Sequence, residues 1–232
     1  MTTKLRVLCL HGYRQNGEKL RGRISAFRRT FKSYVEFVCV DAPIEVPYEP
    51  TSDRTEQTEA GESQEDPRQF SWWDYHIDDT TGAHTYSKVN ESIAYLERIC
   101  KEQGPFDGVF GFSQGGMMAS LLFQLQQTKP NEVPFGFRFG IFVSAASPRD
   151  PSYDFTQETL RFPSVHMMGS TDAVVPVERS RELASRFENA IVYEHSGGHY
   201  IPANKDPKDV LRSFLRDMEA AMLYEGSSEK QQ

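Results

Sequence analysis

The sequence predicts an α/β fold with about six mostly parallel strands, flanked by helices on both faces of the sheet. Short apolar runs of strand length alternate along the chain with segments whose apolar residues recur at helical spacing. The chain has 232 residues, of which 38% are hydrophobic, enough to bury a sizeable core. Alternating strands and helices are typical of a parallel sheet whose two faces are both covered.

Each element follows from its own pattern. Apolar runs predict strands at 5–10, 35–40, 106–112, 139–143, 164–168 and 190–193. Apolar residues at helical spacing predict helices over 20–31, 89–100, 176–187 and 211–222. The segment 117–125 is apolar nearly all round, which indicates a helix buried against the sheet.

One long connection, residues 41–85, departs from this alternation. It has no clear periodicity, its polar acidic part 51–66 is expected to be mobile, and an aromatic stretch, FSWWDYH, follows at 70–76. We therefore expect a single domain over 1–223 with a partly mobile insert at 41–85 and a flexible tail at 224–232.

Composition excludes several classes of protein. The net charge is −7, which argues against nucleic acid and anionic membranes as partners. There is no N-terminal signal-like apolar region and no apolar run of membrane-spanning length, so we expect a cytoplasmic protein. Cys9, Cys39 and Cys100 are widely spaced, which fits core positions in a reducing compartment. No cluster has metal-ligand spacing and no phosphate-binding loop is present, so we expect neither metal nor cofactor.

The stretch GFSQGG at 111–116 lies between a predicted strand and the buried helix. In that context G-x-S-x-G is the nucleophile elbow of the α/β-hydrolase fold, in which a strained turn lifts the serine above the sheet. Gly111 and Gly115 would remove side chains that collide where the chain turns sharply around Ser113. The alternative interpretation is a serine that caps the helix in an ordinary tight loop.

A serine nucleophile needs a base, which in this fold follows it in the chain. His166 lies inside a predicted strand, whereas His195 and His199 lie in the loop HSGGHYIP that follows the last strand. His199 comes after two glycines that allow the backbone to bend toward the sheet, so it is the preferred base, and His195 is a loop or supporting residue.

The acid of the triad should lie between the serine and the histidine in the chain. Asp172 follows the strand predicted at 164–168, and so lies at the same edge of the sheet as Ser113. An aspartate that caps the helix near Pro176 is the alternative, while Asp41 and Asp74 precede the serine.

An oxyanion hole requires two backbone N–H donors. The residue after the nucleophile, Gln114, supplies one, and the loop LHGYRQNG after the first strand should supply the other from Tyr13. His11 opens this loop and is expected to brace it by hydrogen bonding.

Trp72 and Trp73 allow two interpretations. They could wall an apolar acyl or alkyl site, or they could pin the long loop to the domain.

Four motifs in this order, LCLHGYRQNG, GPFDGVFGFSQGG, GSTDAVVP and HSGGHYIP, resemble the FSH-type serine hydrolases. Within them the chain is most similar to the animal esterases known as ovarian-cancer-associated gene two proteins, and GFSQGG is also similar to acyl-protein thioesterases. The resemblance covers residues 4 to about 218, and it implies a compact α/β-hydrolase with the triad Ser113, Asp172 and His199 that hydrolyses carboxylic esters.

Motifs and resemblance together predict a serine esterase for a small-molecule ester or acyl substrate, acting through an acyl-enzyme intermediate. An acyl-thioesterase is the alternative among enzymes. A hydrolase-fold receptor with little turnover is the alternative among binding proteins.

Overall fold

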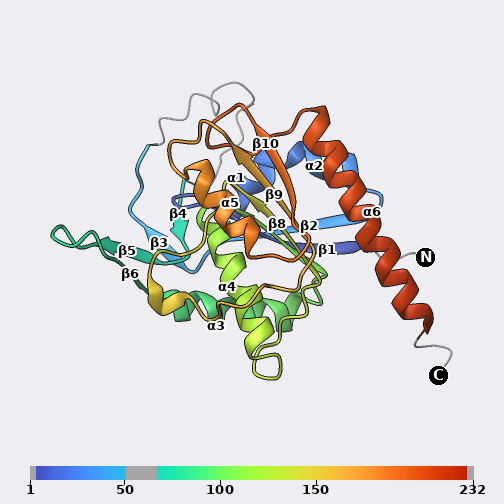
Figure 1. Cartoon of the computed structure of the whole chain (residues 1–232), viewed down its shortest axis with the longest axis horizontal. Coiled ribbons are helices and arrows are strands. Elements are labelled where there is room, and N and C mark those ends of the chain that lie inside the picture. Colours follow the sequence, from blue (N-terminus) through green and yellow to red (C-terminus); the bar gives the residue numbers. More distant parts are fainter. Residues whose placement is uncertain (1–3, 51–66, 229–232) are drawn as a thin grey trace.

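A computed structural model describes residues 4–50 and 67–228 of the chain (Figure 1). Its centre is a six-stranded sheet with the order β10-β9-β8-β7-β1-β2, in which every neighbouring pair is parallel. The strands are β1 (Leu5–Leu10), β2 (Val35–Val40), β7 (Gly108–Phe112), β8 (Phe139–Val143), β9 (Ser164–Gly169) and β10 (Ile191–His195). The predicted α/β fold is confirmed, and each predicted strand appears within a few residues of its expected bounds.

Helices cover both faces of this sheet because each central strand is apolar on both sides. In β1, Val7 and Cys9 belong to one core while Leu8 and Leu10 belong to the other. The first core contains side chains of α1 (Gly17–Arg23), α2 (Ser25–Phe31) and α6 (Lys205–Ser228). The second contains side chains of α3 (Val89–Gln103), α4 (Gln114–Thr128) and α5 (Val177–Ser185), together with both tryptophans.

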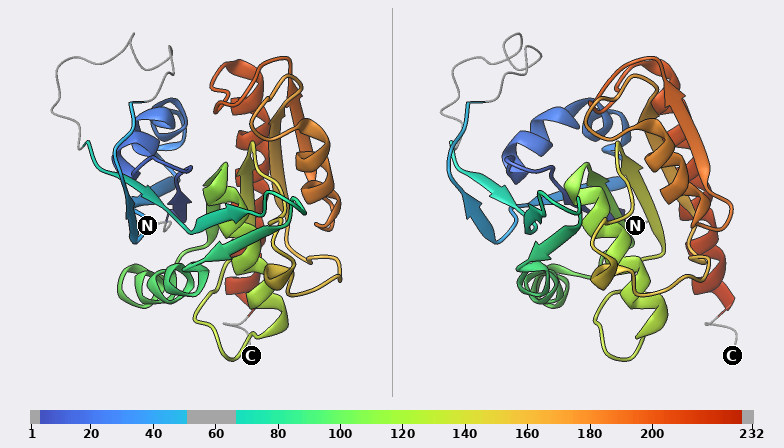
Figure 2. Two further views of the ribbon diagram at one scale, coloured as in Figure 1. Left: turned by 90° about the vertical axis from the view of Figure 1, so that its left-hand side faces the viewer. Right: turned by 60° about the vertical axis from the view of Figure 1, so that its left-hand side comes forward.

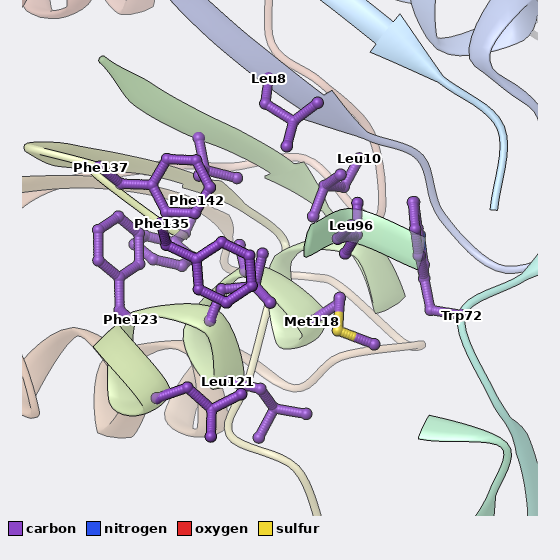
Figure 3. Packing of buried hydrophobic residues seen from close by; sticks show 14 of the residues in the cluster. Leu8, Leu10, Trp72, Leu96, Met118, Leu121, Phe123, Phe135, Phe137 and Phe142 are labelled. Atoms are coloured by element: carbon purple, nitrogen blue, oxygen red, sulfur yellow. The ribbon is translucent and has the colours of Figure 1, made fainter. Parts of the chain in front are cut away.

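The second core is rich in aromatic rings (Figure 3). Phenylalanines gather at one end of it, Trp72 lies at the other, and Met118 lies between them. Helix α4 is buried along most of its length, as its uniformly apolar sequence predicts.

The segment predicted as one helix over 20–31 forms two. Asn16 caps α1 by accepting a hydrogen bond from the Lys19 N–H at 2.8 Å, and the chain then breaks at Ile24, where α2 begins. The apolar spacing continues through the break, since Leu20, Ile24, Phe27 and Phe31 are all buried.

The long connection 41–85 contains three short strands and the start of a fourth, which its sequence did not predict. They are β3 (Ile44–Val46), β4 (Gln69–Ser71), β5 (Asp74–Ile77) and β6 (His84–Ser87), and they pair as β3 with β4 and β5 with β6, both antiparallel. In both views of Figure 2 the β5–β6 hairpin lies beside α3 and α4. The acidic segment 51–66 lies outside the described residues.

The last helix, α6, continues to Ser228, past residue 223 where the sequence suggested that the domain ends. A helix long and apolar enough to cross a bilayer is absent from the described ranges 4–50 and 67–228.

Candidate active site

Ser113 lies at the turn between β7 and α4 with φ 53° and ψ −120°, a backbone conformation that non-glycine residues rarely adopt. Two hydrogen bonds hold this turn: the Ser113 N–H donates to the carbonyl of Val143 at 3.0 Å, and the Met117 N–H donates to the carbonyl of Ser113 at 3.0 Å. The serine thus sits at the N-terminus of a helix and at the carboxyl end of a central strand.

Two glycines make this turn possible. A Cβ at Gly111 would lie 2.4 Å from the Cα of Gly116, inside the turn itself. A Cβ at Gly115 would lie 2.2 Å from the carbonyl oxygen of Leu10, at the end of β1. Gly115 therefore clears the neighbouring strand rather than its own, which allows α4 to begin directly against the loop after β1.

Asp172 and His199 are in contact. Asp172 follows β9, His199 follows β10, and the His199 Nδ1 lies 2.7 Å from Asp172 Oδ2. The other carboxylate oxygen accepts hydrogen bonds from the Val174 N–H at 2.9 Å and the Val175 N–H at 2.8 Å. Burial raises the pKa of Asp172, but the hydrogen bonds from His199 and from these two amides outweigh it, so the pKa lies below its ordinary value. An ionised Asp172 favours the imidazole tautomer with its proton on Nδ1, which leaves Nε2 free to act as a base.

The imidazole of His199 lies beside the turn that carries Ser113. Its ring centroid is 5.0 Å from that of Phe112, the residue before Ser113. The described residues show no hydrogen bond between the Ser113 hydroxyl and His199. Such contacts are often long until substrate is bound.

The other two histidines after Ser113 are held differently. His195 accepts a hydrogen bond from the Gly197 N–H at 3.2 Å, and its Nε2 is buried with no partner among the described residues. His166 is buried inside β9, stacks on Phe142 and contacts the Ser164 hydroxyl at 3.0 Å. Burial lowers the pKa of His166 to about 3, so this side chain stays neutral in the core.

The main-chain amides of Tyr13 and Gln114 are available to a ligand. Neither donates a hydrogen bond to another group among the described residues. Gln114 is the first residue of α4, so its N–H also lies at the positive end of the helix dipole.

His11 controls how the Tyr13 amide is oriented. The Ala42 N–H donates to His11 Nε2 at 2.9 Å, so the ring proton is on Nδ1, which donates to the Gly12 carbonyl at 2.7 Å. The Gly12 carbonyl and the Tyr13 N–H belong to one planar peptide group, so fixing the first also fixes the second. Burial lowers the pKa of His11 to about 4, which keeps this brace neutral near pH 7.

Trp72 connects the two loops that carry these amides. Its indole N–H donates to the carbonyl of His11 at 2.8 Å, and its main-chain N–H donates to the side chain of Gln114 at 3.0 Å. The Gln114 side chain in turn donates to the Trp73 carbonyl at 3.1 Å, and the Ser92 hydroxyl donates to the Trp72 carbonyl at 2.6 Å. The Gln114 side chain and Ser92 have partners distant in the chain, which leave no local pattern in the sequence.

Both tryptophans are buried, with exposed fractions of 0% for Trp72 and 2% for Trp73. Trp73 stacks on Tyr86 with ring centroids 5.1 Å apart. Their burial favours the interpretation in which they attach the long connection to the domain. Three exposed apolar side chains are close to these residues in contact or in sequence, and we call them the apolar rim: Tyr75, whose ring contacts Tyr13, and Val174 and Tyr200, which are close in the chain to Asp172 and His199.

Within the described part of the chain, no group of three or more histidine, cysteine, aspartate or glutamate side chains is placed to hold a metal ion. Cys100 is half-buried, and burial raises the pKa of its thiol to about 12.

Comparison with known proteins identifies close relatives. A model of the serine hydrolase (FSH1) family matches residues 1–211. The chain is 36% identical over 228 residues to Esterase CG5412 of Drosophila melanogaster, covering 94% of this chain and 75% of the relative. It is 36% identical over 225 residues to Esterase OVCA2 of Danio rerio, covering 91% and 96% of the two chains. Among solved structures, the crystal structure of esterase PE8 matches with a TM-score of 0.60 and 20% identity over 94% of both chains, which supports the same fold.

Proposed function

The chain belongs to the serine hydrolase (FSH1) family, and we propose that it cleaves carboxylic esters through Ser113, His199 and Asp172 by way of an acyl-enzyme. The observation that carries this proposal is the contact of 2.7 Å between His199 Nδ1 and Asp172 Oδ2, beside a serine held at positive φ. A hydrogen-bonded acid–base pair next to a strained serine is the arrangement that activates a hydroxyl for acyl transfer.

In the first half of the reaction, His199 Nε2 takes the proton of the Ser113 hydroxyl as the oxygen attacks the ester carbonyl. Asp172 stabilises the imidazolium that forms. The amides of Tyr13 and Gln114 donate to the developing oxyanion. Collapse of the tetrahedral intermediate breaks the ester bond, and His199 returns its proton to the leaving alcohol.

In the second half, His199 removes a proton from a water molecule that attacks the acyl-enzyme. The acid product leaves and Ser113 regains its proton. Since Tyr75, Val174 and Tyr200 are exposed at the rim, we propose an apolar acyl or alkyl chain as the part of the substrate that contacts the protein.

A fluorophosphonate probe tests the nucleophile. We expect labelling of the wild type, and we expect Ser113→Ala to lose both labelling and ester hydrolysis. Ser144→Ala is a matched control, because Ser144 directly follows the neighbouring strand β8, is buried and also has a positive φ of 47°. Labelling that persists in Ser113→Ala would refute the assignment. Matched esters and thioesters of one acyl group, assayed together, decide between an esterase and a thioesterase.

A further inference from the structure

Two arginines whose charges are not compensated meet at the loop that follows β8, Arg149 from the loop itself and Arg179 from α5. Arg149 donates from Nη1 to His84 Nε2 at 2.9 Å, and its main-chain N–H donates to the Tyr86 hydroxyl at 2.8 Å. Arg179, from α5, donates from Nη2 to the carbonyl of Ser147 at 2.9 Å. Both guanidinium groups are therefore held by neutral acceptors, and neither forms an ion pair with a carboxylate among the described residues.

The two arginines are close enough for their positive charges to affect each other and His84. The pKa of Arg179 is lowered, first by burial and then by the charge of Arg149. The pKa of His84 is lowered by burial and by both arginines, so His84 stays neutral and orients Arg149 without adding charge. We call His84, Arg149 and Arg179 the arginine cluster.

Two acidic residues lie nearby, and neither neutralises this cluster by contact. Asp150 accepts hydrogen bonds from the Tyr86 N–H at 2.7 Å and the Ser152 N–H at 2.9 Å. Glu182 raises the pKa of Arg179, but no carboxylate oxygen of Glu182 lies within 4.0 Å of that guanidinium. By contrast, Arg181 on the same helix pairs with Glu194 at 2.7 Å.

The loop that carries Arg149 leaves the sheet at the edge where the candidate triad residues follow their strands. Strand β8 is placed between β7, which leads to Ser113, and β9, which leads to Asp172. The last residue of β8, Val143, accepts the hydrogen bond of the Ser113 N–H, and the chain then continues to Ser147 and Arg149. The Ser147 hydroxyl is buried without a partner among the described residues, so it adds a free donor at the same loop.

We propose that the arginine cluster binds a carboxylate carried by the substrate, so that the preferred substrates are esters with a free carboxylate at a distance from the scissile bond. This inference rests on the proposed esterase function. Two like charges held together are stabilised by an anion between them, and guanidinium groups are well suited to a carboxylate. The apolar rim then contacts the methylene chain between the carboxylate and the ester.

The test compares substrates that differ only in this charge. Monoesters of adipate and suberate are paired with esters of 6-methylheptanoate and 8-methylnonanoate, in which an isopropyl group replaces the carboxylate. A third pair places the carboxylate, or the isopropyl group that replaces it, on the alcohol side of a hexanoate ester. We expect kcat/KM for the charged member of at least one pair to exceed that of its neutral partner by about tenfold, as a charge-assisted hydrogen bond allows. Added salt should reduce the preference.

Variants assign the preference to residues. Arg179→Gln and Arg149→Gln should each reduce the charged-to-neutral ratio by about tenfold, and Arg179→Lys should restore part of it. Arg181→Gln is the matched control, because it removes the same charge from the same helix and should leave the ratio unchanged. If Arg179 had a purely structural role, Arg179→Gln would lower kcat/KM equally for the charged and the neutral ester of a pair.

The outcomes separate the two proposals. Neutral esters hydrolysed in a Ser113-dependent manner, without a preference in any pair, would refute the carboxylate site and leave the esterase intact. A ratio that is unchanged in both arginine variants would also refute it. Failure to hydrolyse any ester would refute the proposed function, and with it this inference.

Discussion

His199 Nδ1 lies 2.7 Å from Asp172 Oδ2, and only 1% of the Asp172 side chain is exposed. The second carboxylate oxygen accepts hydrogen bonds from two main-chain N–H groups. The orientation of the imidazole is therefore set by protein groups alone.

The first prediction concerns this pair. In Asp172→Asn, the amide oxygen can keep the two main-chain hydrogen bonds, while the amide NH₂ faces His199 Nδ1 and favours the wrong tautomer. We expect kcat to fall by about a thousandfold or more, with a melting temperature close to that of the wild type. Steady-state kinetics measure kcat, and thermal unfolding measures the melting temperature. A kcat within tenfold of the wild type would contradict this role for Asp172.

The second prediction separates the two loop histidines. His199→Ala should reduce kcat by roughly a thousandfold or more, because no base remains for Ser113. His195→Ala is the matched control from the same loop, and it should have a much smaller effect, since its Nε2 has no partner among the described residues. If the larger loss occurred in His195→Ala, the base would be misassigned.

The third prediction concerns the hydrogen bond from Trp72 to the His11 carbonyl. Trp72→Phe keeps most of the buried ring but loses the indole donor, so the loop carrying the Tyr13 amide is held less firmly. We expect kcat to fall by about tenfold with little change in KM, and affinity for a trifluoromethyl ketone to fall in parallel. Trp73→Phe is the control, because the Trp73 indole donates to no group among the described residues. Equal losses in both variants would argue for simple packing.

The fourth prediction concerns the burial of Trp73. Trp73→Ala removes a ring that stacks on Tyr86 and should destabilise the fold by roughly 3–5 kcal/mol. Because the side chain is 2% exposed, the preference among ester chain lengths should not change. Melting temperature and kcat/KM over a series of linear esters provide the two readouts. A flattened chain-length profile would show instead that Trp73 contacts the substrate.

The fifth prediction concerns acid stability. Burial lowers the pKa of His11 to about 4 and that of His166 to about 3, from 6.5 in the unfolded chain. As pH falls from 6.5 toward 4, the unfolded chain binds protons at these two sites and the folded chain does not, so stability is lost. Each site contributes up to about 1.4 kcal/mol per pH unit.

His166→Gln tests this, since His166 lies away from the candidate triad. Its denaturation free energy, followed from pH 6.5 to 4.5, should fall less steeply than that of the wild type by about one site's contribution. Parallel curves for the two proteins would mean that His166 has the same pKa in the folded and the unfolded chain.

The residues of the candidate triad could be proposed from the sequence because each follows a strand in a recognisable motif. GFSQGG, GSTDAVVP and HSGGHYIP follow β7, β9 and β10, and parallel strands bring their carboxyl ends to one edge. The structure brings Asp172 and His199 into contact there.

Other features had no local signal. Strands of three or four residues, such as β3 and β5, are too short to show a period, so 41–85 was expected to be an irregular connection. The helix break at Ile24 leaves the spacing of the apolar residues unchanged, so that spacing could not predict the break. The bonds from Trp72 to His11 and Gln114 join residues far apart in the chain, and only the folded chain brings them together.

The close approach of Gly115 to the end of β1 affects how enzymes with this fold can acquire new substrates. A single absent methyl group allows α4 to meet the end of β1, so main-chain atoms set the spacing between the turn that carries Ser113 and the loop beside it. The exposed side chains of Val174 and Tyr200 are not among the atoms that meet at this close approach. New substrates can therefore be acquired by exchanging rim residues one at a time, while the reaction centre is inherited unchanged.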